Sequence, residues 1–156
     1  MTCRAAVRAP ATTLVVQAAR DFVAAEWAIQ AAALRSLTQH LDMVAPDPVR
    51  CRHAFESGIY DECDSDEVIP FLENRPDHYD LIMAADLRPG EFELPLLFSA
   101  VKIALALAGV FIAVIPAGAF DAGELRDMAK AEGLIVLAVE PVMLPGGSGF
   151  CLVAES

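Results

Sequence analysis

The sequence predicts an α/β domain with a doubly wound, mostly parallel seven-stranded sheet and an antiparallel hairpin at the carboxyl end. Three observations predict this class. Short apolar stretches alternate with alanine-rich or charged stretches of helical character, which is the pattern of β-α units. Residues 81–85 are continuously apolar, as in a parallel strand covered on both faces. The last two apolar stretches are joined by a short turn at residues 144–147, which favours a hairpin.

The length of 156 residues fits one domain. We predict a loose leader over residues 1–11 and a single domain over residues 12–156. Apolar residues make up 56% of the chain, and the mean hydropathy is +0.46. The longest apolar stretch nevertheless contains Pro95, Lys102 and Gly109, so it divides into a helix and a strand and predicts no membrane span. No apolar segment follows Arg4 and Arg8 before Pro10, so we expect no signal peptide and a cytoplasmic protein.

The net charge of −11 disfavours a nucleic-acid partner, because the average field repels phosphates. The cysteines form no CxxC pair and are expected to be free thiols: Cys3, Cys51, Cys63 and Cys151. A metal site built from Cys51, His53, Cys63 and Asp64 matches no known ligand spacing. The sequence therefore predicts no metal site.

The first half of the chain is expected to hold three strands and three helices. The strands are predicted at residues 12–17, 41–45 and 59–63, where apolar and β-branched residues gather. Helices are predicted at residues 20–37, which are rich in alanine, and at residues 49–57, which Gly58 ends. The acidic residues 64–67 are expected to supply the N-cap and first turn of a third helix, which runs to about Asn74.

The second half begins with the central strand at residues 80–85, which Asp86 follows. A turn at residues 88–90, a helix over 94–107 and a strand over 110–115 come next. Asp121 is expected to cap a helix that runs through Glu132 and ends at Gly133. Strands over residues 134–142 and 148–154 complete the sheet, and only the last is predicted to be antiparallel.

Several segments, taken in order, resemble class I S-adenosylmethionine-dependent methyltransferases of the bacterial TPR-associated type. The segments are GIYD at 58–61 with VIPFL at 68–72, YDLIMAAD at 79–86, EL at 124–125, AEGL at 131–134 and GFCLVA at 149–154. The likeness covers roughly two-thirds of the chain, from Gly58 to the end. It implies a Rossmann-like methyltransferase fold and S-adenosylmethionine as the cofactor.

The chain departs from the family where the cofactor is bound. The family's first strand runs into a D-x-G-x-G loop, whereas this chain has no glycine at the corresponding positions, Gln17, Ala18, Ala19, Arg20 and Asp21. The family's ribose-binding carboxylate falls at Ala45, and Asp47 or Asp42 replaces it only if the loop is re-aimed. The adenine-contacting acidic position is matched by Asp66 or Glu67. These departures predict weak or absent cofactor binding, because backbone without glycine cannot approach the ligand as closely.

Asp86 is the candidate catalytic residue, since ligands of open α/β sheets lie at the carboxyl ends of strands. It is equally well interpreted as a solvated carboxylate that caps the following turn. Asp66 and Glu67 are also explained as charges at a helix amino terminus. The histidines His40, His53 and His78 are expected at the surface, and Trp27 is expected to be a core or interface anchor.

The residues together favour a methyltransferase-like pseudoenzyme that acts as a binding or scaffold subunit, as a homo-oligomer or with a protein partner. The family's N-terminal pocket helices are missing, which should leave an exposed apolar patch. The alternative is an active methyltransferase on an unidentified small-molecule or protein substrate, since methyl transfer depends mainly on proximity and orientation. A receiver domain is disfavoured, because the acidic pair it needs after the first strand is replaced by Gln17, Ala18 and Ala19.

Overall fold

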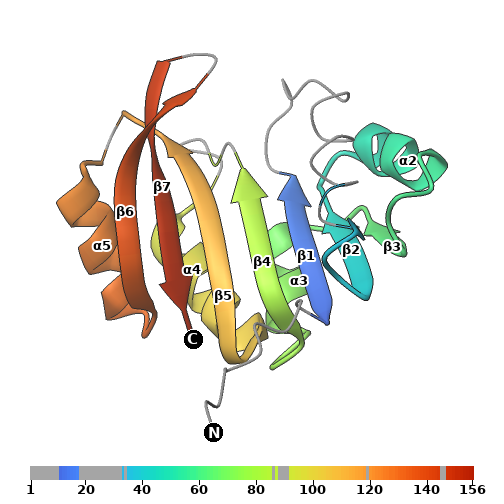
Figure 1. The fold of residues 1–156 in the computed structure, drawn as a ribbon, viewed down its shortest axis with the longest axis horizontal. Helices are drawn as coiled ribbons and strands as arrows, with labels where there is room; N and C mark the ends of the chain where they lie inside the picture. The colour runs from blue at the N-terminus through green and yellow to red at the C-terminus, as the bar shows by residue number, and fades with distance from the viewer. Residues whose placement is uncertain are drawn as a thin grey trace, which may run out of the picture.

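The computed structural model describes residues 11–17, 33, 35–85, 87, 92–118, 120–144 and 147–156. They form one seven-stranded sheet in the order β3-β2-β1-β4-β5-β7-β6, flanked by helices (Figure 1). The strands are β1 (Thr12–Gln17), β2 (His40–Val44), β3 (Glu62–Asp64), β4 (Tyr79–Ala85), β5 (Leu105–Pro116), β6 (Ile135–Leu144) and β7 (Gly147–Glu155). The predicted fold class is confirmed.

The order in which the chain adds strands to the sheet reverses next to β1. From β1 the chain moves outward to β2 and β3, and it then returns to β4 and β5 on the other side of β1. These five strands are parallel. β7 is antiparallel to both β5 and β6, so the prediction that only the last strand runs against the others is confirmed.

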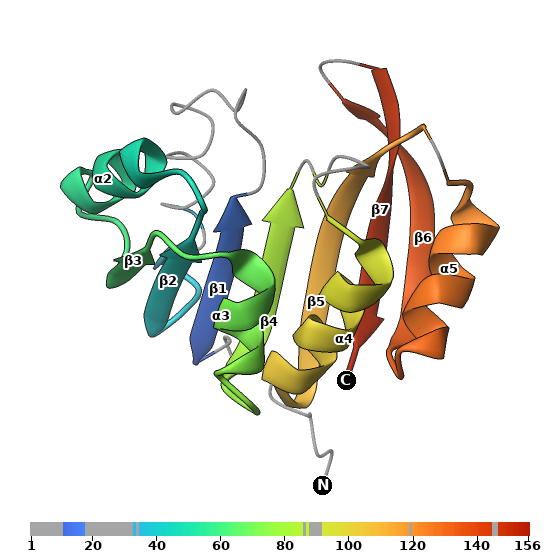
Figure 2. The same cartoon turned by 180° about the vertical axis from the view of Figure 1, so that it is seen from behind.

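Three helices cover one face of the sheet: α3 (Val68–Glu73), α4 (Leu94–Ala104) and α5 (Ala122–Ala131), as Figure 2 shows. The main core lies between these helices and β1, β4, β5 and β7. Phe98 of α4 meets Phe111 of β5 edge to face with ring centroids 6.2 Å apart, and both are fully buried. Such pairs stabilise a core beyond the area that they bury.

The opposite face is covered differently along the sheet. Beside β1 and β2, α2 (Pro48–Glu56) packs Cys51 and Ala54 into a second core cluster with Leu41 and Met43. On β4, β5 and β7, the side chains that point away from the main core stay partly exposed. Met83, Ile112 and Val153 are opposite one another on β4, β5 and β7, and each is only half-buried.

The predicted end of α4 and the predicted start of β5 are both wrong. The helix predicted to reach residue 107 ends at Ala104, and β5 begins at Leu105 rather than at residue 110. The backbone carbonyls of Ile103 and Ala104 accept hydrogen bonds from the amides of Asp77 and His78, which pairs this stretch with the start of β4. A Cβ at Gly109 would lie 3.0 Å from the Tyr79 carbonyl oxygen, so glycine permits this close approach.

The third strand was also predicted too early, at residues 59–63. Tyr60 is buried in the second core cluster, where Ile59 packs against it, and both precede β3. Asp61 bonds to the edge of β2 instead, through its amide to the Leu41 carbonyl and through Oδ2 to the Leu41 amide. Regular pairing with β2 therefore begins only at Glu62.

Local signals in the last third of the chain are confirmed. Asp121 Oδ1 accepts a hydrogen bond of 2.8 Å from the Glu124 amide and caps α5, and Gly133 follows the helix with a φ of 92°. The helix predicted at residues 20–37 lies largely outside the described residues, as do most of the predicted leader and Trp27. No helix in the described part of the chain is long and apolar enough to cross a bilayer.

Candidate cofactor site and a neighbouring ligand cluster

The carboxyl ends of four parallel strands meet at one edge of the sheet. Gln17 at the end of β1 pairs with Ala85 at the end of β4, and Val44 at the end of β2 pairs with Val16 and Asp64. In a doubly wound sheet the ligand site lies outside these ends, where the strand order reverses. That place is between β1 and β4 in this protein.

The structure locates only part of the predicted site. The backbone of Gln17 ends β1, whereas its side chain, Ala18 and Ala19 lie outside the described residues. Asp86, the candidate catalytic residue, is also outside them, although it follows the last residue of β4 in sequence. Its catalytic role stays a prediction.

Among the described residues, β2 itself ends without a carboxylate. Ala45 is fully buried, and its amide donates a 3.0 Å hydrogen bond to the Asp64 carbonyl. Asp47, the nearest following carboxylate, is the N-cap of α2, because its Oδ1 accepts a 2.9 Å hydrogen bond from the Val49 amide. Asp42 points away from this end and contacts Tyr79 and His40 near the strand's beginning. Both predicted substitutes for the ribose carboxylate are thus engaged elsewhere.

Asp66 and Glu67 lie in the exposed segment between β3 and α3. Glu67 occupies the N-cap position of α3, but its side chain makes no capping hydrogen bond, and the first turn contains no acidic residue. The prediction that residues 64–67 provide an acidic first turn is therefore wrong, since the helix begins later, at Val68. The assignment of Asp66 or Glu67 to adenine contact stays a prediction.

This edge of the sheet is acidic. The Cys51 thiol donates to the Asp64 carbonyl at 3.2 Å, and burial raises the pKa of the thiol, with Asp64, Asp47 and Asp66 adding to the effect. Burial also raises the pKa of Asp64, while the positive charge of Arg75 counteracts it. An electronegative edge favours a ligand that carries positive charge.

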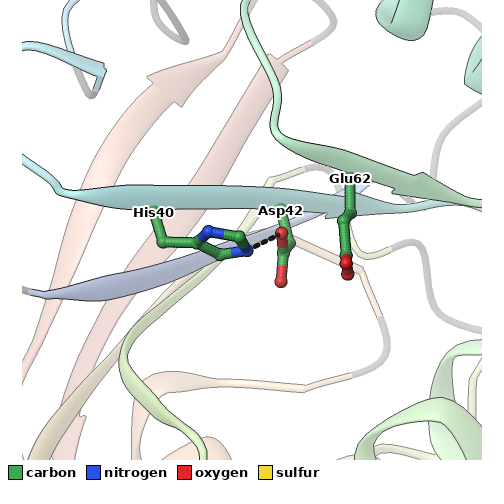
Figure 3. A group of neighbouring side chains, drawn as sticks. All are labelled: His40, Asp42 and Glu62. Atoms are coloured by element: carbon green, nitrogen blue, oxygen red, sulfur yellow. Dashed lines mark ion pairs between the residues drawn. The ribbon is translucent and has the colours of Figure 1, made fainter.

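A second group of polar side chains lies at the opposite, amino-terminal edge of β2 and β3. His40, Asp42 and Glu62 each place one ligand atom within 4.8 Å of the others (Figure 3). The Nε2 atom of His40 lies 2.8 Å from Asp42 Oδ1, and its Nδ1 lies 3.7 Å from Asp61 Oδ2. Arg35 pairs with the same oxygen of Asp61.

The sequence prediction missed this group and treated His40 as an unpartnered surface histidine. Part of the signal was in the sequence, because His40 and Asp42 are two residues apart and residues i and i+2 of a strand share a face. Glu62 joins them only through the pairing of Asp42 with Glu62 across β2 and β3. The alternative set of Cys51, His53, Cys63 and Asp64 does not assemble into a ligand cluster among the described residues.

No family model and no curated protein sequence matches the chain. Solved structures do. The N-methyltransferase NodS from Bradyrhizobium japonicum WM9 superposes with a TM-score of 0.69 at 12% identity, over 95% of this chain and 86% of NodS. This chain has the class I methyltransferase fold. The 1,6-didemethyltoxoflavin-N1-methyltransferase from Burkholderia thailandensis, which holds S-adenosylhomocysteine, gives a TM-score of 0.68 at 14% identity, over 94% of this chain and 71% of that enzyme.

The methyltransferase fold is not tied to methyl transfer. The [4+2]-cyclase SpnF superposes equally well on this chain, with a TM-score of 0.68 at 12% identity over 94% of this chain and 75% of SpnF. Function therefore has to be inferred from the residues at the site rather than from the architecture.

Proposed function

We propose that this protein is a methyltransferase-fold subunit that binds S-adenosylmethionine weakly or not at all and that acts through protein association. The observation that carries the proposal is the end of β2. A buried alanine occupies the ribose-binding position, and the next carboxylate, Asp47, caps α2. Two ribose hydroxyls would lose a charged acceptor, and a hydrogen bond to a charged group contributes about 1.5–3 kcal/mol, or one to two decades in affinity.

The loop after β1 supports the same conclusion from sequence. It contains Ala19 and Asp21 where the family has glycines, with Ala18 and Arg20 beside them. Side chains there would occupy the space that the methionine moiety takes, and alanine does not tolerate the positive φ angles that glycine does. The resemblance assigns Asp66 or Glu67 to adenine contact, so we expect residual rather than tight binding.

The partly uncovered face of the sheet supports association. Half-buried apolar side chains run across β4, β5 and β7, with Met83, Ile112 and Val153 in one row. Exposed apolar patches of this kind typically mark interaction surfaces. A second copy of this chain is the simplest partner, because the same face would be buried on both subunits of a twofold dimer.

The cofactor part of the proposal is tested by restoring the loop. The variant Ala19→Gly/Asp21→Gly and the wild-type chain are compared by thermal shift across a series of S-adenosylhomocysteine concentrations. We expect little stabilisation of the wild type and a larger, saturable shift for the variant. A saturable shift of the wild type at micromolar ligand, abolished by Asp47→Asn, would instead show an intact and rebuilt site, as in an active methyltransferase.

The association part is tested by sedimentation velocity on wild type and Val153→Lys. A lysine in the apolar row should abolish self-association because its charge would be buried at the interface. Leu107→Lys is the matched control, since Leu107 is 95% exposed and lies outside this row. A wild-type chain that sediments as a monomer at high concentration would contradict the self-association.

The free thiols of Cys51, Cys63 and Cys151 suit the cytoplasm, where we place the protein.

A further inference from the structure

Three side chains with metal-binding atoms emerge from one face of two neighbouring strands. His40 and Asp42 alternate along β2, and Glu62 on β3 is paired with Asp42. Figure 3 shows the imidazole turned toward Asp42, with Glu62 on the far side of the aspartate. The cluster lies on the first three residues of β2 and the first residue of β3, whereas the candidate cofactor site lies at the carboxyl ends of the strands.

Asp42 is the decisive member of the cluster. Its side chain is 3% exposed, and the Tyr79 hydroxyl donates to Oδ2 at 3.3 Å. The other oxygen, Oδ1, is buried and receives no hydrogen bond of good geometry from the described residues, although His40 Nε2 is only 2.8 Å away. A buried carboxylate oxygen is costly unless a donor or a cation lies beside it, and both His40 and a bound metal ion can supply that partner.

The spacing fits a metal ion with ligands at right angles. Bonds of about 2.0–2.2 Å from a divalent ion to nitrogen and oxygen place adjacent right-angled ligands about 2.9 Å apart and opposite ligands about 4.2 Å apart. The 2.8 Å between His40 Nε2 and Asp42 Oδ1 matches the adjacent separation. The ligand atoms of all three side chains lie within 4.8 Å of one another, so one ion can contact them after small side-chain rotations. Glu62 is exposed, so rotation of its side chain can bring its carboxylate to bonding distance from the ion.

Charge and donor type point to the kind of ion. Two carboxylates and a neutral imidazole carry two negative charges, which a divalent cation neutralises. Imidazole nitrogen together with carboxylate oxygen suits zinc, nickel, cobalt or manganese better than magnesium or calcium, which prefer oxygen alone. Asp61 lies 3.7 Å from the other ring nitrogen of His40, on the side where a carboxylate commonly orients a metal-bound histidine.

We propose that His40, Asp42 and Glu62 bind one divalent transition-metal ion that ties the short edge strand β3 to β2. Asp42 and Ala45 are three residues apart, so at about 3.3 Å per residue the ion lies about 10 Å or more from the ribose position. The ion therefore stabilises the edge of the sheet and does not take part in chemistry at the carboxyl ends. β3 has only three residues, which makes a cross-link to β2 valuable there.

The site is tested with cobalt(II) and zinc(II) added to metal-free protein. We expect one equivalent of cobalt to bind, with visible d–d absorption and without the intense thiolate charge-transfer bands that cysteine ligands give. Zinc should displace it and raise the melting temperature in a concentration-dependent manner. Metal should also slow amide exchange at residues 62–64, a change that binding elsewhere would not produce.

Matched variants assign the ligands. His40→Gln and Glu62→Gln should each weaken cobalt binding at least about tenfold, and the exposure of Glu62 keeps that variant folded. His53→Gln and Glu73→Gln are the controls, because both side chains are exposed and lie outside the cluster. Absence of stoichiometric binding, or binding that both ligand variants leave unchanged, would overturn the proposal and leave His40 as the sole partner of Asp42 Oδ1 among the described residues.

Discussion

Tyr79 and Tyr60 offer a paired test of the buried polar network. Tyr79 is fully buried, and its hydroxyl donates to Asp42 Oδ2 at 3.3 Å. Tyr60 has a buried hydroxyl without a hydrogen-bond partner among the described residues. The same substitution, tyrosine to phenylalanine, therefore removes a used donor at one position and an unused one at the other.

The expected magnitudes differ in size and sign. Loss of a hydrogen bond to a charged group costs about 1.5–3 kcal/mol, and the 3.3 Å separation is longer than the usual O–H···O distance of about 2.7–2.8 Å. We therefore expect Tyr79→Phe to lower the free energy of unfolding by about 1.5 kcal/mol, the low end of that range. Tyr60→Phe should be neutral or stabilising, because it removes a hydroxyl whose burial is uncompensated.

The effect of Tyr79→Phe should depend on pH. Burial raises the pKa of Asp42, and the charge of Glu62 adds to this rise; His40 lowers the pKa, and the Tyr79 hydroxyl lowers it further by stabilising the carboxylate. A raised pKa means that the folded state binds the Asp42 proton more tightly, so its stability falls as pH rises through that pKa. Without the hydroxyl the pKa is higher still, so the total fall is larger. The deficit of Tyr79→Phe is thus largest above the pKa of Asp42 and shrinks in acid.

Urea denaturation with chelator present, monitored by circular dichroism at pH 7 and near pH 4, measures these differences. Equal slopes with urea for all three proteins would show that the unfolded states are comparable. A Tyr79→Phe variant as stable as wild type at pH 7, or a Tyr60→Phe variant that loses as much, would refute the assignment of the Tyr79–Asp42 hydrogen bond.

Three further predictions concern the scaffold. Asp121→Ala should cost about 1 kcal/mol of unfolding free energy in the same urea assay, since it removes the α5 cap. Gly149→Ala should cost about 1–3 kcal/mol, because the new Cβ would lie 2.7 Å from the Ile115 carbonyl oxygen; an unchanged melting temperature would contradict this packing. Burial raises the pKa of Cys63 to about 12, so mass spectrometry should find it alkylated far more slowly in native than in urea-unfolded protein at pH 8.

Local signals in the sequence were sufficient to predict most of the fold. The continuous apolar run of β4 and the short turn between β6 and β7 are strong local signals, and all three strands are found where expected. Asp121 and Gly133 mark the ends of α5 correctly. The third strand was misplaced, because Ile59 and Tyr60 have strand-forming side chains but pack in the core ahead of the strand. Burial of those side chains depends on α2 and β2, which local sequence does not reveal.

The candidate site was less accessible to prediction. Asp47 followed by Pro48 is itself a helix-start signal, so its capping role was available from sequence, and the structure shows it in that role. The His40 cluster needs the register of β2 against β3, which brings residues 42 and 62 together across twenty positions of sequence. Pairing between distant segments is set by the whole sheet and not by local pattern.

The dissociation constant of the wild-type protein for S-adenosylhomocysteine, measured by isothermal titration calorimetry, tests the central functional claim most directly. With a buried Ala45 and a capping Asp47 at the end of β2, we predict no measurable heat or a dissociation constant of about 100 µM or weaker, corresponding to no more than about 5.5 kcal/mol of binding free energy. A dissociation constant of a few micromolar or tighter would contradict the loss of the cofactor site and would favour an active methyltransferase.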